Sequence, residues 1–200
     1  MGNIAGSIAA LLTANGIIQD IDTDKCRYGL EIFISSILEL TSILLISIFM
    51  NNFLETLLFF TAFIPLRIYA GGYHADTHLR CYMVSLGVYV LFTILMRTIP
   101  IYQYEIIVYI DISISSLIVL FLSPIKHNNK TLTPQKTKTY KKISIVICAI
   151  ESGILLLCLI AIGEDTTIMA FSLGLSAETL SIIAAVIKEA VKHKKESPAL

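Results

Sequence analysis

Long and nearly uninterrupted apolar blocks constrain this chain more than any other feature. A helix needs about 20 mostly apolar residues to cross a bilayer, and five blocks meet or approach that length, while a sixth is shorter and is followed at once by Arg67. Only 15% of the 200 residues are charged, whereas a soluble domain carries about 25%. We therefore expect an all-α, polytopic integral membrane protein with about six transmembrane helices, at residues 30–50, 53–66, 82–99, 105–122, 143–162 and 166–187.

The first 22 residues are expected to form a separate element. Ile4, Ile8 and Leu11 recur at near-helical spacing, and Asn15-Gly16 interrupts the pattern. This pattern predicts an amphipathic N-terminal helix that lies along the membrane surface, with a buried helix of the soluble type as the alternative. Together with the spans, it makes residues 1–200 a single membrane-embedded domain.

The basic residues predict the orientation. If the N-terminus lies in the cytoplasm, all but Arg97 of the fifteen Lys and Arg residues fall on the cytoplasmic side, as the positive-inside bias requires. Both termini are then cytoplasmic. Residues 123–142 are lysine-rich and polar, which is typical of a cytoplasmic loop drawn to anionic lipid, or of a dock for an acidic peptide. The formal net charge is zero, so no nucleic-acid partner is expected.

Acidic residues inside the spans are costly and are functional suspects. Glu39, Asp111, Glu151 and Glu178 lie inside spans, and no basic residue shares a span centre with them. We therefore expect some of them to be protonated, or hydrogen-bonded to Ser and Thr on neighbouring helices. A non-enzymatic membrane transporter would depend on Asp111, Glu151 and Glu178, whereas polar helix–helix contacts are the plainer interpretation.

Residues 67–81 stand apart, because a loop that only turned the chain would not need their chemistry. Cys81 has cationic residues and a histidine close in sequence, the conditions that favour a reactive thiolate. The segment is expected on the cytoplasmic side. Its candidate functional residues are Arg67, Gly71, Gly72, His74, His78, Arg80 and Cys81.

Spacing predicts a bend between His74 and Cys81. On one straight helix they would lie about 10 Å apart along the axis, whereas a base and its nucleophile need hydrogen-bond contact of about 3 Å. Gly71-Gly72 permits unusual backbone angles, and Asp76 or Thr77 can cap a new helix. Cys81 would then lie near a helix N-terminus, whose positive dipole end favours a thiolate.

Arg67 or Arg80 could add positive potential near Cys81, or could bind a substrate carboxylate in bidentate fashion. Two other interpretations of this segment stay open. It could be a polar connector with an incidental cysteine. It could also be a metal site, because His74, His78 and Cys81 would share one face of a continuous helix.

The run Arg67-x-x-Ala70-Gly71-Gly72-x-His74-Ala75, with Cys81 seven residues beyond His74, resembles the accessory gene regulator B family. These are membrane endopeptidases of Gram-positive bacteria that process the precursor of a peptide pheromone. The resemblance implies that Cys81 is the nucleophile, that His74 is its general base, and that no metal or other cofactor takes part. Supporting positions would be Arg67, Gly71, Gly72, Arg80, Lys126 and Lys130.

The resemblance also implies the reaction and the partners. Cys81 would cleave the C-terminal part of a pheromone propeptide through an acyl-enzyme thioester, and the peptide would cyclise to a thiolactone or lactone used in quorum sensing. A homodimer in the cell membrane, in contact with lipid, is implied as well. Thr131 follows Lys130 where the family leads us to expect proline. A third catalytic residue is left open among Asp76, Ser85 and Glu39.

Overall fold

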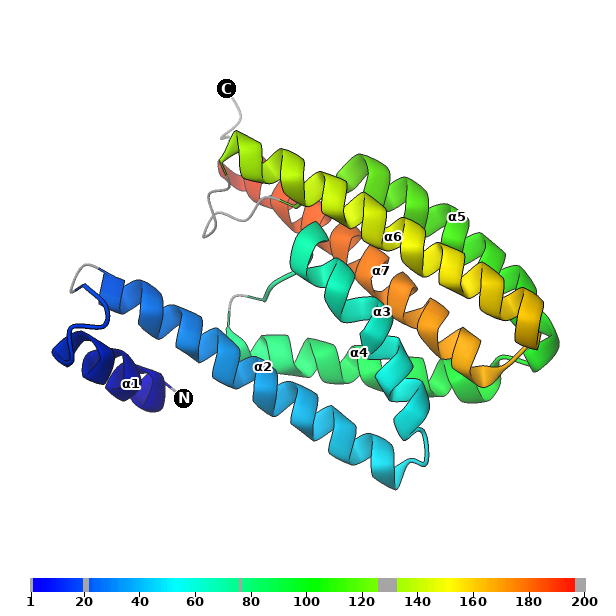
Figure 1. Ribbon diagram of the computed structural model, residues 1–200, viewed down its shortest axis with the longest axis horizontal. Helices are drawn as coiled ribbons and strands as arrows, with labels where there is room; N and C mark the ends of the chain where they lie inside the picture. Colours follow the sequence, from blue (N-terminus) through cyan, green and yellow to red (C-terminus); the bar gives the residue numbers. More distant parts are fainter. Residues whose placement is uncertain (1, 20–21, 76, 126–132, 197–200) are drawn as a thin grey trace. The chain divides into compact units, whose positions relative to one another are not determined.

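The structure is a computed structural model that describes residues 2–19, 22–75, 77–125 and 133–196. Within these ranges it is all-helical and contains no strand. The helices follow one another in chain order, and Figure 1 labels the α-helices among them. They are α1 (Gly2–Ala14), α2 (Thr23–Phe49), α3 (Phe53–Ala70), α4 (His78–Thr98), η2 (Ile101–Gln103), α5 (Tyr104–Leu122), α6 (Pro134–Ile162) and α7 (Thr166–Glu196).

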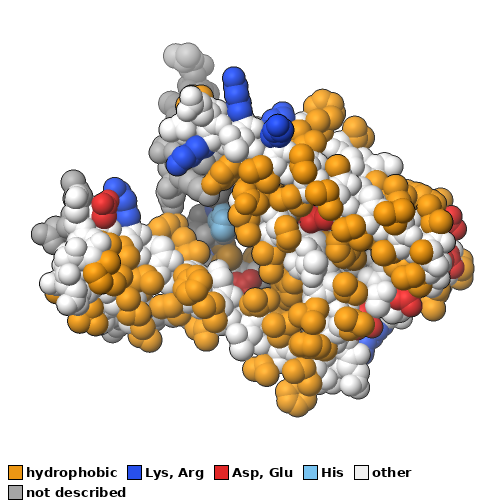
Figure 2. Space-filling view, viewed as in Figure 1, with side chains coloured by type: hydrophobic (Ala, Val, Ile, Leu, Met, Phe, Trp, Pro, Cys, Tyr) orange, Lys and Arg blue, Asp and Glu red, His pale blue; other side chains and the backbone are white. Residues whose placement is uncertain are grey.

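Among the residues that the structure describes, six helical segments are long and apolar enough to cross a membrane, as expected for a multi-pass membrane protein. They are 23–49, 53–70, 79–98, 101–122, 134–162 and 166–192, so every predicted span has its counterpart. The short sixth block, after Asn52, forms a full 18-residue helix that contains Pro65 and has Arg67 in its last turn. Apolar side chains cover much of the face in Figure 2, and some, such as Ile160 at 79%, are largely exposed. Such side chains need lipid around them.

The predicted bounds of the N-terminal helix and of the polar stretch are wrong. The N-terminal helix ends at Ala14, well before residue 22, because Gly16 takes a positive φ of 67°. The polar stretch 123–142 is not a loop throughout, because α6 begins at Pro134. Thr133 caps this helix by accepting a hydrogen bond from the Lys136 N–H (3.4 Å). Lys136 to Lys142 are therefore helical, while residues 126–132, with Lys126 and Lys130, lie outside the described residues.

The chain forms two compact units. The first comprises residues 1–51 and 75–89, and the second comprises 52–74 and 90–200. In the first, α1 packs on α2 through the small buried side chains Ala5 and Ala9. The hydroxyls of Thr13 and Thr23 lie 2.8 Å apart and close the connection between the two helices. This packing leaves Ile4 and Leu11 exposed, as expected for the apolar face of an interfacial helix.

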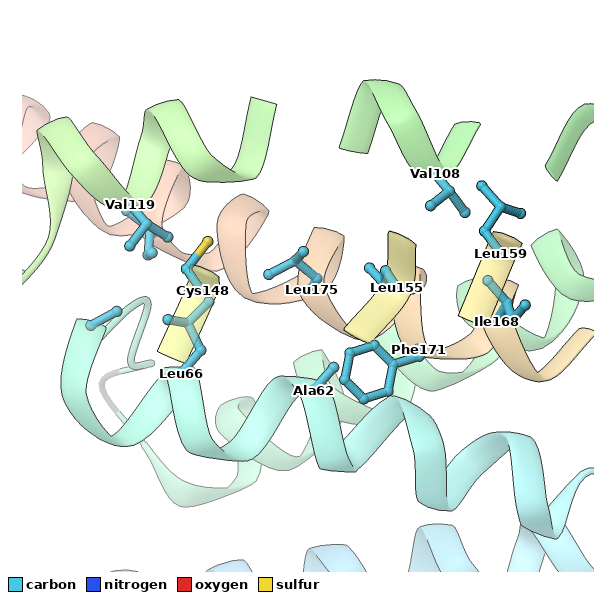
Figure 3. Close-up of a cluster of buried hydrophobic side chains, with 12 residues drawn as sticks. Ala62, Leu66, Val108, Val119, Cys148, Leu155, Leu159, Ile168, Phe171 and Leu175 are labelled. Atoms are coloured by element: carbon cyan, nitrogen blue, oxygen red, sulfur yellow. The ribbon is translucent and has the colours of Figure 1, made fainter. Parts of the chain in front are cut away.

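The second unit is a bundle in which α7 contacts α3, α5 and α6. Its core consists of buried apolar side chains from these helices, among them Leu66, Leu155 and Leu175 (Figure 3). Helices α3 and α7 approach very closely at Gly174. A Cβ added at this glycine would overlap the carbonyl oxygen of Phe59 and lie 3.0 Å from the Ala62 Cβ. Close packing through small residues is a usual source of helix association in membranes.

Candidate functional site

Helix α3 continues to Ala70, beyond the predicted end of this span at residue 66, and ends at the paired glycines. Gly71 takes φ 75° and donates its N–H to the Arg67 carbonyl, and L-residues with a side chain rarely adopt that backbone region. Residues 71–75 then have no regular secondary structure. The Ile125 N–H donates to the Ala70 carbonyl (2.8 Å). The end of α3 is therefore tied to the segment that follows α5.

Arg67 organises the segment after this turn. Its Nη1 donates to the Ser181 hydroxyl on α7 (2.5 Å), and its Nη2 donates to the Tyr73 carbonyl. The Tyr73 N–H in turn donates to the hydroxyl and the carbonyl of Ser181, both at 3.0 Å. A Cβ at Gly72 would overlap the Arg67 guanidinium, so only glycine fits there. The guanidinium thus binds the protein's own backbone.

Glu178 completes this group, and the sequence reasoning missed its partner. The carboxylate is fully buried (0% exposed) and lies 3.7 Å from the Arg67 Nη1. The sequence places no basic residue at the span centre beside this acid, but Arg67 reaches it from the end of the neighbouring helix α3. The neighbouring guanidinium offsets the cost of burying the negative charge of this carboxylate in a low-dielectric interior. We call Arg67, Tyr73, Glu178 and Ser181 the Arg67 network.

His74 follows the network directly in the chain. Its side chain is exposed, and its carbonyl accepts a hydrogen bond from the Lys188 ammonium on α7 (2.9 Å). The same ammonium lies 5.2 Å from the centre of the Tyr73 ring, within the range of a cation–π contact. The main chain around His74 is therefore held by α7.

Cys81 is the fourth residue of α4, in its first turn. Thr77 caps this helix, as predicted: its hydroxyl accepts from the Arg80 N–H (3.3 Å), and its carbonyl accepts from the Cys81 N–H (3.0 Å). The cysteine is half-buried and forms no disulfide. Cys26 occupies the matching position, the fourth residue of α2, and is also half-buried.

The remaining candidates have these places. Arg80 is exposed in α4, while Ser85 and Glu39 are half-buried. His74 belongs to the second unit and Cys81 to the first, so their pairing stays a prediction.

The metal interpretation required one continuous helix over 74–81. Because α4 begins only at His78, that premise is wrong. Within the described ranges, no three His, Cys, Asp or Glu side chains could hold a metal ion. Asp76 lies outside them.

The buried acids inside the spans differ in their hydrogen bonding. Asp111 accepts hydrogen bonds from Ser115 (2.9 Å) on its own helix and from Ser172 and Ser176 (each 2.6 Å) on α7. It therefore makes the predicted contact with hydroxyls of a neighbouring helix. The carboxylate oxygens of Glu151 and Glu178 are buried and have no hydrogen-bond partner among the described residues.

Comparisons with known proteins agree over most of the chain. The family described as accessory gene regulator B matches residues 5–182. An accessory gene regulator protein B of Staphylococcus intermedius is 26% identical over 65% of this chain and 68% of its own length. An AgrB-like protein of Clostridium perfringens is 30% identical over 74% of this chain and 72% of its own. An accessory gene regulator protein B of Staphylococcus haemolyticus is 24% identical over 80% and 81%, respectively. No solved structure matches.

Proposed function

Because the chain belongs to the accessory gene regulator B family, we propose that it is a membrane cysteine endopeptidase that processes a pheromone propeptide. Family membership links it to the accessory gene regulator system. The observation that carries the finer proposal is the break between α3 and α4, which leaves His74 in a non-helical segment and Cys81 in a capped first turn. A base and a nucleophile seven residues apart need such a break in order to meet.

The proposed reaction is acyl transfer. His74 accepts the thiol proton, and the Cys81 thiolate attacks a carbonyl carbon near the C-terminal end of the propeptide. The C–N bond breaks, the amine leaves with the proton from His74, and a thioester joins the peptide to Cys81. A thiol or hydroxyl of the bound peptide then attacks this thioester, forms the ring and regenerates Cys81. Water must be excluded meanwhile, because hydrolysis would release a linear peptide.

The setting of the reaction belongs to the same proposal. The positive-inside bias supports cytoplasmic termini, with residues 67–81 at the cytoplasmic face of the cell membrane. The relatives come from Gram-positive bacteria, and we propose the same origin here. The family further supports a homodimer surrounded by lipid, forming one functional domain over residues 1–200. Lys126 and Lys130 are proposed to face the acidic part of the propeptide, and Arg80 to add positive potential near Cys81.

Cys26 provides a matched control for testing the nucleophile. Both cysteines are half-buried and fourth in their helices, so helix dipole and accessibility are comparable. The purified protein in lipid nanodiscs is treated with iodoacetamide at pH 7, and the alkylation of each cysteine is followed by mass spectrometry. We expect Cys81 to react at least about tenfold faster than Cys26, because an adjacent imidazole supplies the thiolate. In His74→Ala, Cys81 should be alkylated no faster than Cys26.

A second measurement tests the reaction itself. The protein is incubated with a synthetic pheromone propeptide of the accessory gene regulator system, called an AgrD-type propeptide below. Mass spectrometry then tests for an adduct on Cys81 that a free thiol removes. We expect the adduct in wild type and its absence in Cys81→Ala and His74→Ala. Equal alkylation of Cys81 and Cys26 in wild type, or processing that survives Cys81→Ala, contradicts the proposal.

A further inference from the structure

We propose that Glu178 and Ser181 on α7 are positioning residues that act through Arg67 to fix the backbone of His74. This inference rests on the proposed function, in which His74 is the general base. It adds two residues about a hundred positions further along the chain, outside the motif. The argument concerns the second unit only, which contains all the residues involved.

The first step is that both peptide groups flanking His74 are hydrogen-bonded. The peptide group before it is held through the Tyr73 carbonyl, which accepts from the Arg67 Nη2. The peptide group after it is held through the His74 carbonyl, which accepts from Lys188 (2.9 Å). A peptide group is planar and rigid. Fixing the two planes therefore sets φ and ψ at His74, and with them the direction in which its Cβ leaves the chain.

The second step is that Ser181 anchors the segment one peptide earlier. Its hydroxyl accepts from Arg67 (2.5 Å) and from the Tyr73 N–H (3.0 Å), and its carbonyl accepts from the same N–H. One residue of α7 thus binds both the guanidinium and the main chain that the guanidinium holds. If this hydroxyl is removed, Arg67 loses one of its two hydrogen-bond acceptors in the network.

The third step is the charge of Arg67. Glu178 lies 3.7 Å from the guanidinium, a distance typical of an ion pair rather than a hydrogen bond. Neither carboxylate oxygen has a hydrogen-bond partner among the described residues. Glu178 therefore acts by compensating the positive charge of Arg67, whose side chain is only 19% exposed. Without the negative charge of Glu178, burying the Arg67 guanidinium is costly. Solvated rotamers of Arg67 then compete with the rotamer that binds Tyr73.

The experiment measures Cys81 alkylation relative to Cys26 in the same molecule. Wild type, Glu178→Gln, Ser181→Ala, Ser181→Thr and the control Ser176→Ala are prepared in nanodiscs. Ser176 is a serine on the same helix that binds Asp111 instead of the network. Cys26 serves as an internal standard, because a general loss of folding changes both rates.

We expect Glu178→Gln and Ser181→Ala to lower the Cys81-to-Cys26 ratio at least about fivefold, towards the value in His74→Ala. Ser181→Thr should restore most of the ratio, because it keeps the hydroxyl, and Ser176→Ala should leave it unchanged. With the AgrD-type propeptide, the loss should fall on kcat rather than on KM, since no substrate contact is removed.

The possible failures are distinguishable. If the wild-type ratio is near one and does not depend on His74, the proposed function itself is wrong. If the ratio is high and His74-dependent, but Glu178→Gln and Ser181→Ala retain it, only the positioning role is refuted. A fall of the same size in Ser176→Ala would assign the effect to general packing of α7, and would also overturn the inference.

Discussion

Replacing Gly72 with alanine is the sharpest perturbation of the Arg67 network. The new Cβ would overlap the Arg67 Nη1, and would lie 3.0 Å from its Cζ and 2.6 Å from the Ser181 Oγ. The Gly72 backbone does not have a positive φ, so the cost is steric rather than conformational. Since Arg67 carries the overlapping atoms, the guanidinium must leave its place.

The magnitude follows from what Arg67 then loses. Its hydrogen bonds to Ser181 and to the Tyr73 carbonyl are charge-assisted, and each such bond contributes about 1.5–3 kcal/mol. Glu178 is left buried without its cation, and breaking a buried ion pair costs about 3–5 kcal/mol. These terms overlap, so we expect the free energy of unfolding to fall by about 3–5 kcal/mol. Loss of a general base lowers rates by about 10²–10⁴, and propeptide processing should fall at least about 100-fold.

A double-mutant cycle tests this reasoning by SDS-induced unfolding in mixed micelles. In an Arg67→Met background the guanidinium is gone, so Gly72→Ala should cost far less, with a coupling energy of about 3 kcal/mol. Gly153→Ala is the control on α6, because a Cβ there meets nothing within 4 Å, and it should stabilise by about 0.5–1 kcal/mol. Equal costs of Gly72→Ala in both backgrounds would refute the steric argument.

Three further predictions concern the helices around the site. Gly174→Ala should destabilise the α3–α7 contact by several kcal/mol in the same unfolding assay, since its Cβ overlaps the Phe59 carbonyl, and an unchanged midpoint would contradict the close approach. Hydrogen bonds from the Thr167 hydroxyl and N–H lower the pKa of Asp165, which caps α7. The cap should therefore contribute about 1 kcal/mol above pH 4, and the difference between wild type and Asp165→Ala in thermal unfolding should vanish as the pH falls through that lowered pKa. Asp111→Asn should lower stability but leave processing of an AgrD-type propeptide intact; loss of processing at full stability would contradict a purely structural role for Asp111.

The apolar blocks predicted the helices well because each block must be long enough to cross hydrocarbon. The end of α3 was harder to predict, since Arg67 looked like a boundary, although it lies in the last turn of the helix. The start of α6 was missed, although Thr133 followed by Pro134 is a recognised helix-start signal. The helix N-terminus before Cys81 was predictable, because Thr77 and the paired glycines are local signals.

The Arg67 network could not be read from the sequence. Its central hydrogen bond joins residues 114 positions apart, and no local pattern says which face of α7 meets α3. Glu178 was recognised as an unusual intramembrane acid, but its cation was sought on the span centres. Arg67 reaches it from a helix end, and only the packing of α3 against α7 brings the two together.

Helix α3 is short and packs against two much longer helices. At 1.5 Å per residue, its 18 residues span about 27 Å, whereas the 29 residues of α6 and 31 of α7 span about 44 and 46 Å. A hydrocarbon core about 30 Å deep therefore reaches the turn at Gly71 while α6 and α7 continue beyond it. Lipids with longer acyl chains would submerge this non-helical turn, and irregular backbone exposed to hydrocarbon is costly, whereas shorter ones would leave it in the headgroups. Membrane thickness thereby becomes a physical variable that acts on the segment carrying His74.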